Sequence, residues 1–180
     1  MSDAVVLIGH GAPATDCPPQ WIGELMALQW RQGGNHQPPL SDRAAALDAE
    51  IRDWPRRSDN DPYKIGLEQL ADALRALLPT ALLAVGYNEF CRPSIAQAIE
   101  SVIAQGATRI VVIPSMLTPG GVHSECDIPE ALEAVRRTHP SVTITYLWPF
   151  PVGEVARLLA AHVRQAIARD TSTPTRSPST

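Results

Sequence analysis

Four short runs of apolar, largely β-branched residues alternate with amphipathic helical segments along most of the chain. The runs lie at residues 4–9, 81–86, 109–114 and 142–148. Continuous apolar runs of this length are typical of strands that are buried on both faces, and parallel strands need long crossover connections. The sequence therefore predicts an α/β fold in three layers, with a four-stranded parallel sheet flanked by helices.

Helical spacing of apolar residues predicts the helices of this sheet at residues 67–78, 93–103, 127–135 and 152–167. Pro93 is expected in the first turn of its helix, where a missing N–H does no harm. Asp127 stands at the start of the following helix, and we expect its side chain to cap that helix.

Residues 16–63 interrupt the alternation, because a strand normally reaches its crossover helix after a loop of only a few residues. Apolar spacing predicts two amphipathic helices within this insertion, one around residues 22–29 and one over residues 40–54. We interpret four large side chains here as packing residues rather than as the wall of a ligand pocket: Trp21, Met26, Trp30 and Trp54.

Length and composition predict one domain over residues 1–169. The chain has 180 residues, of which 44% are hydrophobic, so it can bury one sizeable core. Residues 170–180 are rich in serine, threonine and proline without apolar anchors, and we expect this tail to be disordered.

Charge and cysteine usage exclude several classes of partner. The formal net charge of −4 provides no basic field for nucleic acid or for an anionic membrane surface. Three cysteines, an odd number at low density, indicate a reducing compartment, and we expect a cytoplasmic protein. The first apolar run is too short for a signal sequence or a membrane span.

Polar clusters follow the first three predicted strands. Gly9-His10-Gly11 follows the first, a segment with Glu89 and Cys91 follows the second, and a segment with His123 and Cys126 follows the third. Ligands of open α/β sheets bind at the carboxyl ends of the strands, and two imidazoles with a carboxylate suit a first-row divalent metal. His10, His123 and Glu89 are therefore the candidate site.

The remaining histidines and cysteines are weighed against ordinary structural roles. His36, His139 and His162 are interpreted as solvated or hydrogen-bonded, because no strand end brings them together. Cys91 or Cys126 with a neighbouring histidine is compatible with a cysteine-dependent hydrolase, although a cysteine in such a chain is more often a small buried hydrophobe. Neither a phosphate-binding glycine motif nor the Gly-x-Ser-x-Gly of α/β-hydrolases is present.

The order and spacing of these pieces resemble the small class II chelatases, the sirohydrochlorin cobalto-, ferro- and nickelochelatase family. The resemblance covers residues 4–15 and about 64–168, and the insertion departs from it. The segments that carry it are Gly9-His10-Gly11, Glu89 followed by Pro93-Ser94-Ile95, Gly106 before residues 109–114, and Gly121-Val122-His123 with Asp127-Ile128-Pro129.

The resemblance implies a lyase of cobalamin or sirohaem biosynthesis that inserts Co²⁺, Fe²⁺ or Ni²⁺ into a tetrapyrrole such as sirohydrochlorin. The metal is then a substrate, and no organic cofactor is expected. In this family pattern His10 and His123 match the metal-site histidines, and Glu89 matches the acidic residue beside them. Short members pair two lobes, so a homodimer is possible.

Metal insertion requires that two pyrrolic protons leave while the ion exchanges water for ring nitrogens. Imidazole changes its charge near neutral pH and must be neutral to bind a metal or to take a proton. We expect His10 and His123 to perform these tasks with help from Glu89, and Arg92 to pair with a carboxylate of the substrate. The alternative is a carrier that binds the tetrapyrrole or the metal without turnover.

Overall fold

The computed structural model describes residues 2–31, 41–78 and 82–171. The chain divides into two compact units, Met1–Trp148 and Pro149–Thr180. The first unit holds the sheet and its covering helices, and the second holds helix α6 (Val152–Thr171). The helix predicted at residues 152–167 is therefore present. The disordered tail predicted for residues 170–180 falls almost wholly outside the described residues, and the single domain over residues 1–169 stays a prediction.

The first unit is built on four parallel strands in the order β2-β1-β3-β4. Their bounds are Ser2–Gly9 (β1), Leu82–Tyr87 (β2), Ala107–Pro114 (β3) and Thr143–Tyr146 (β4). Strand β1 therefore runs between β2 and β3, and Ile8 is in register with Gly86 on one side and with Pro114 on the other. The predicted parallel α/β sheet is confirmed, and three of its strands end side by side.

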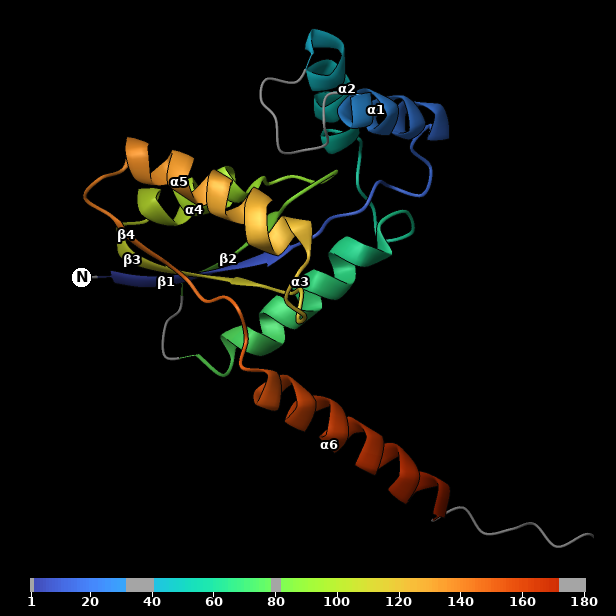
Figure 1. Cartoon of the computed structure of the whole chain (residues 1–180), viewed down its shortest axis with the longest axis vertical. Helices are drawn as coiled ribbons and strands as arrows, with labels where there is room; N and C mark the ends of the chain where they lie inside the picture. The colour runs from blue at the N-terminus through green and yellow to red at the C-terminus, as the bar shows by residue number, and fades with distance from the viewer. Residues whose placement is uncertain (1, 32–40, 79–81, 172–180) are drawn as a thin grey trace, which may run out of the picture. The chain divides into compact units, whose positions relative to one another are not determined.

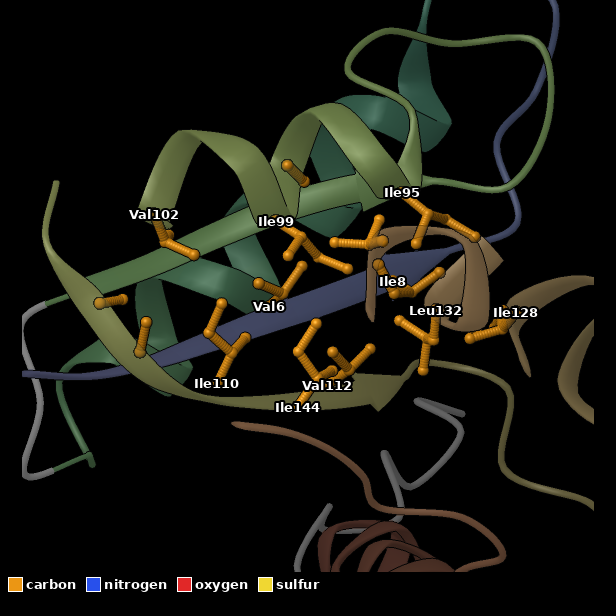
Figure 2. Packing of buried hydrophobic residues seen from close by; sticks show 14 residues of the cluster. Val6, Ile8, Ile95, Ile99, Val102, Ile110, Val112, Ile128, Leu132 and Ile144 are labelled. Carbon is orange, nitrogen blue, oxygen red and sulfur yellow. The ribbon is translucent and has the colours of Figure 1, made fainter. Parts of the chain in front are cut away.

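One face of the sheet is covered by α4 (Ile95–Ala104) and α5 (Ile128–Thr138), as Figure 1 shows. Aliphatic side chains from the two helices interlock with those of the strands in the main core (Figure 2). Ser94 caps α4 in a capping box with Gln97, a motif worth about 1 kcal/mol. Pro93 lies before this cap, so its predicted place in the first helical turn is wrong.

The opposite face is covered by α3 (Pro62–Arg75), which packs Leu67 and Ala71 against β1 and β2. A Cβ at Gly9 would lie 2.2 Å from Leu67 Cδ2, so glycine here lets α3 approach the end of β1 without displacing the Leu67 side chain. Helix α3 begins five residues earlier than the predicted start at residue 67, because Asp61 caps it and Pro62 occupies its first turn. The sheet is thus enclosed between helical layers.

The insertion forms a helical pair, α1 (Pro19–Arg31) and α2 (Asp42–Arg52), with a core of its own. Trp21 and Trp54 stack edge to face with ring centroids 5.6 Å apart, which is the packing role predicted for them. Met26 and Trp30 are 57% and 84% exposed, so the packing role predicted for these two residues is wrong. Residue 40, the predicted start of the second helix, lies outside the described residues.

Within the described part of the chain, no helix combines the length and the apolar character needed to span a bilayer.

Candidate metal centre

Three potential metal ligands converge at the carboxyl end of the sheet. His10 follows β1, Glu89 follows β2, and His123 lies beyond β3. Their ligand atoms all lie within 4.8 Å of one another, and the two imidazole centroids are 4.5 Å apart. The three residues that the sequence singles out are thus brought together, because β1 separates β2 from β3 by a single strand spacing on each side.

His10 is held from both sides by its own loop and by α3. Its backbone N–H donates to the Tyr63 hydroxyl at 2.8 Å, and its Nδ1 lies 2.7 Å from the carbonyl oxygen of Gly11. Because a carbonyl can only accept, this contact favours a proton on Nδ1 and leaves Nε2 with a free lone pair. Nε2 lies 3.7 Å from Glu89 Oε2.

His123 opens a single turn of π-helix, His123–Asp127, that runs directly into α5. Its Nδ1 lies 2.6 Å from Asp127 Oδ2, and the Asn88 amide donates to the same carboxylate oxygen at 3.1 Å. Asn88 Nδ2 also lies 2.8 Å from this Nδ1, but the Asp127 carboxylate is closer and can only accept, which favours a proton on Nδ1 and leaves Nε2 available to a metal. Tyr146 of β4 steadies this turn by donating to the Ser124 carbonyl at 3.1 Å.

The predicted capping role of Asp127 is wrong. Its side chain makes no cap hydrogen bond to α5, because helical backbone already begins at His123 and Asp127 has helical dihedral angles. The carboxylate is instead directed at the imidazole one turn earlier, and it is the orienting partner of His123.

Glu89 stands on a tight turn that packs against the His10 loop. The Glu89 N–H donates to the His10 carbonyl at 2.8 Å, and the Cys91 N–H donates to the Glu89 carbonyl at 2.6 Å. Phe90, at the centre of this turn, has a φ of +58°, a conformation that costs a non-glycine residue on the order of 1 kcal/mol. A Cβ at Gly11 would lie 1.9 Å from the Glu89 carbonyl oxygen, so the two loops touch backbone to backbone.

The CbiX family profile matches residues 58–168, more than half of the chain. This chain belongs to the CbiX family. The matched residues include Glu89 and His123, whereas His10 and the first helical pair precede them.

Two curated proteins that are similar to this chain are named as chelatases. The chain is 41% identical over 70 residues to a sirohydrochlorin cobaltochelatase of Priestia megaterium, an alignment that covers 39% of this chain and 22% of that protein. It is 28% identical over 165 residues to a ferrochelatase of Stenotrophomonas maltophilia, covering 83% of this chain and 49% of that protein. The CbiX chain thus spans between about a fifth and a half of these relatives.

A solved structure extends the likeness to the fold of nearly the whole chain. It is a cobalamin (vitamin B12) biosynthesis CbiX protein from Marinobacter aquaeolei VT8, with a TM-score of 0.53 and 19% identity. The match covers 95% of this CbiX chain and 96% of the other, so the two proteins share a fold over nearly their full lengths.

Arg92 does not join the cluster in this CbiX chain. Its guanidinium binds the Asp53 carboxylate, with its Nε 2.8 Å from Oδ1, and the hydrogen bond from Arg92 holds the pKa of Asp53 below its usual value. The predicted pairing of Arg92 with a substrate carboxylate therefore requires exchange of this partner, and it stays a prediction.

Cys91 and Cys17 lack the surroundings of a nucleophile, whereas a role for Cys126 stays a prediction. Cys91 is buried, its thiol donates to the Ala12 carbonyl at 3.2 Å, and burial raises the pKa of this thiol. Burial likewise raises the pKa of Cys17. Since a nucleophilic cysteine needs a lowered pKa, neither residue supports the hydrolase alternative. His139 lies at the end of α5 and His162 lies in α6, and neither is a member of the ligand cluster; His36 lies outside the described residues.

Two further residues of the site were not predicted from the sequence: Tyr63, which orients the backbone of His10, and Asn88, which orients the carboxylate of Asp127. Asn88 had a signal, because it directly precedes Glu89 at a strand end. Tyr63 had none, since its contact spans 53 residues and depends on how α3 packs.

Proposed function

We propose that this chain inserts a divalent metal into sirohydrochlorin, with His10, Glu89 and His123 as the residues that handle the metal. The observation that carries this proposal is the convergence of His10, His123 and Glu89, with an oxygen acceptor beside the Nδ1 of each imidazole. Two imidazole nitrogens and a carboxylate oxygen suit Co²⁺, Fe²⁺ and Ni²⁺. Membership of the CbiX family and the names of its relatives support the tetrapyrrole as the second substrate.

The chain's residues account for both halves of the reaction. Before transfer, His10 and His123 bind the metal ion through Nε2, and Glu89 supplies negative charge that favours a dication. As the ion moves to the ring nitrogens, the imidazoles and the Glu89 carboxylate become free to accept the two pyrrolic protons. Side-chain exposures of 39% for His10 and 22% for His123 leave both imidazoles accessible from solvent.

The homodimer implied by the resemblance belongs to the same proposal. A second lobe facing this open site would enclose a macrocycle that one lobe leaves exposed to solvent. Sedimentation velocity of the purified 19.5 kDa chain tests it, with a dimer as the expected species and a monomer at all concentrations as the contrary result. Cytoplasmic location likewise stays a prediction.

An anaerobic absorbance assay tests the function. Sirohydrochlorin and protoporphyrin are offered separately with Co²⁺, Fe²⁺ or Ni²⁺, and reactions without protein correct for spontaneous insertion. We expect many turnovers with sirohydrochlorin and at least one metal. Spectral change that stops at one equivalent of tetrapyrrole per chain would instead identify a carrier. Conversion of protoporphyrin but not of sirohydrochlorin would show that the proposed substrate is wrong.

A further inference from the structure

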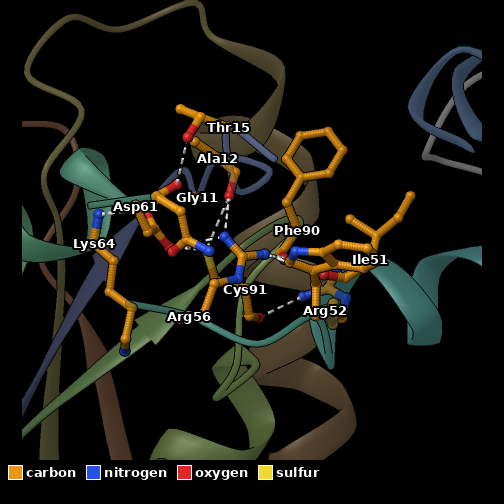
Figure 3. A network of polar contacts seen from close by, with 12 residues as sticks. Gly11, Ala12, Thr15, Ile51, Arg52, Arg56, Asp61, Lys64, Phe90 and Cys91 are labelled. Atoms are coloured by element: carbon orange, nitrogen blue, oxygen red, sulfur yellow. Dashed lines mark hydrogen bonds and ion pairs between the residues drawn. The ribbon is translucent and has the colours of Figure 1, made fainter. Parts of the chain in front are cut away.

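Arg56, in the segment between α2 and α3, joins the two loops that carry the candidate ligands. Its Nη1 donates to the Ala12 carbonyl at 2.8 Å and to Asp61 Oδ2 at 2.7 Å, and its Nη2 donates to the carbonyls of Ile51 and Phe90 (Figure 3). Ala12 is two residues from His10, and Phe90 is next to Glu89. One guanidinium therefore ties the His10 loop to the Glu89 turn.

The ion pair behind this contact is buried. Side-chain exposures are 12% for Arg56 and 2% for Asp61. Asp61 is fixed independently, because its other carboxylate oxygen accepts the Lys64 N–H at the start of α3. Removing the guanidinium would leave a buried carboxylate without its cation, so the pair holds Arg56 in one position.

Arg52, at the end of α2, binds the same turn from the insertion. Its Nη1 donates to the Cys91 carbonyl at 3.1 Å and its Nη2 to the Asn88 carbonyl at 2.9 Å. Arg52 and Arg56 together donate to three backbone carbonyls of the Glu89 turn, those of Asn88, Phe90 and Cys91. The remaining carbonyl, of Glu89, lies against Gly11.

The two arginines hold a strained backbone conformation in place. Phe90 has a positive φ, and its carbonyl is the one that Arg56 binds. A turn in this conformation persists when its surroundings over-determine it. Relaxation of Phe90 would rotate the adjoining peptide and carry Glu89 away from His10.

We propose that Arg56, paired with Asp61 and assisted by Arg52, is a positioning residue that sets the separation of Glu89 from His10. The inference rests on the proposed function, because it assigns Glu89 to the metal. It also gives the insertion a role: α2 and the segment after it supply the two arginines that hold the Glu89 turn in place.

Calorimetric titration of the full chain with Co²⁺ tests this inference without tetrapyrrole. Arg56→Lys keeps the charge but loses the planar fork that reaches several acceptors. We expect it to weaken Co²⁺ binding about tenfold or more, as loss of an orienting partner does at metal sites. In a Glu89→Gln background the same substitution should change the affinity less than about twofold, since Arg56 acts through Glu89.

Arg43→Lys is the matched control, because Arg43 lies in α2 and pairs with the exposed Glu24 away from both loops. It should bind Co²⁺ like the wild type. The inference is overturned if Arg56→Lys binds Co²⁺ normally, or if its loss is equal in the wild-type and Glu89→Gln backgrounds, which would indicate a merely structural role.

Arg52→Lys decides the matter if Arg56→Lys fails to fold, because it leaves the buried ion pair intact. Weaker binding that depends on Glu89 supports the inference, and wild-type binding overturns it. Absence of Co²⁺ binding by the wild-type chain would instead overturn the proposed ligand set. Failure of the two proposals is thus distinguishable.

Discussion

The Nδ1 atom of His123 lies 2.6 Å from Oδ2 of Asp127, one helical turn further along the same segment. This contact makes Asp127 responsible for the direction of the His123 lone pair. Replacing Asp127 by alanine should weaken Co²⁺ binding about 10- to 100-fold, because the imidazole loses both its tautomer preference and its orientation. Calorimetry with Glu130→Ala, an exposed acidic residue in the first turn of α5, provides the control. Equal affinities for the two variants would show that Asp127 has no orienting role.

Gly11 and Gly66 should respond in opposite ways to alanine. At Gly11 the new Cβ meets the Glu89 carbonyl oxygen at 1.9 Å and φ is +94°, so the substitution should destabilise the fold by more than about 1 kcal/mol and weaken Co²⁺ binding. At Gly66, inside α3, nothing lies within 4 Å, and alanine should stabilise by about 0.5–1 kcal/mol. Urea unfolding measures both, and a neutral Gly11→Ala would contradict the close contact of the two loops.

Thiol reactivity should separate the three cysteines. Cys17 and Cys91 are buried with raised pKa values, whereas Cys126 is partly exposed. Iodoacetamide should therefore modify Cys126 first in the folded chain, and the other two only after denaturation. Peptide mass spectrometry locates the label. Rapid labelling of Cys91 in the folded protein would revive the cysteine-hydrolase alternative.

Tyr146 should make stability depend on alkaline pH. Burial raises the pKa of Tyr146 to about 12, against 10.0 for an ordinary tyrosine. Its contribution is therefore complete below pH 10 and is lost as the pH rises toward 12, because the unfolded chain ionises first. Tyr146→Phe loses the hydrogen bond to Ser124, worth about 1 kcal/mol, at pH 8. The difference in unfolding free energy between the two proteins should shrink above pH 10 and reverse in sign before pH 12, because the raised pKa outweighs one hydrogen bond, and a constant difference would contradict the raised pKa.

The sheet and the ligand cluster were predictable because both follow from local pattern and strand order. Runs of β-branched residues mark buried parallel strands, and ligands placed after neighbouring strands must converge. The orienting role of Asp127 was not predictable, since an aspartate before a proline-bearing helix normally caps it, and only the extra π-helical turn moves it inside the helix.

The arginines of the insertion were also beyond prediction from the sequence. Arg56 reaches Phe90 across 34 residues and Ala12 across 44, contacts that depend on how the helical pair packs against the sheet. The exposure of Met26 and Trp30 has a similar cause. Helical spacing shows which residues share a face, but not what covers that face.

Histidine replacement in the anaerobic sirohydrochlorin assay tests the central claim most directly. His10→Ala and His123→Ala should each lower Co²⁺ insertion by about 100-fold or more while the circular dichroism spectrum stays that of the wild type, because each change removes one Nε2 ligand and proton acceptor. His162→Ala, an exposed histidine of α6, should insert Co²⁺ at the wild-type rate. Wild-type rates in both His10→Ala and His123→Ala would contradict the account.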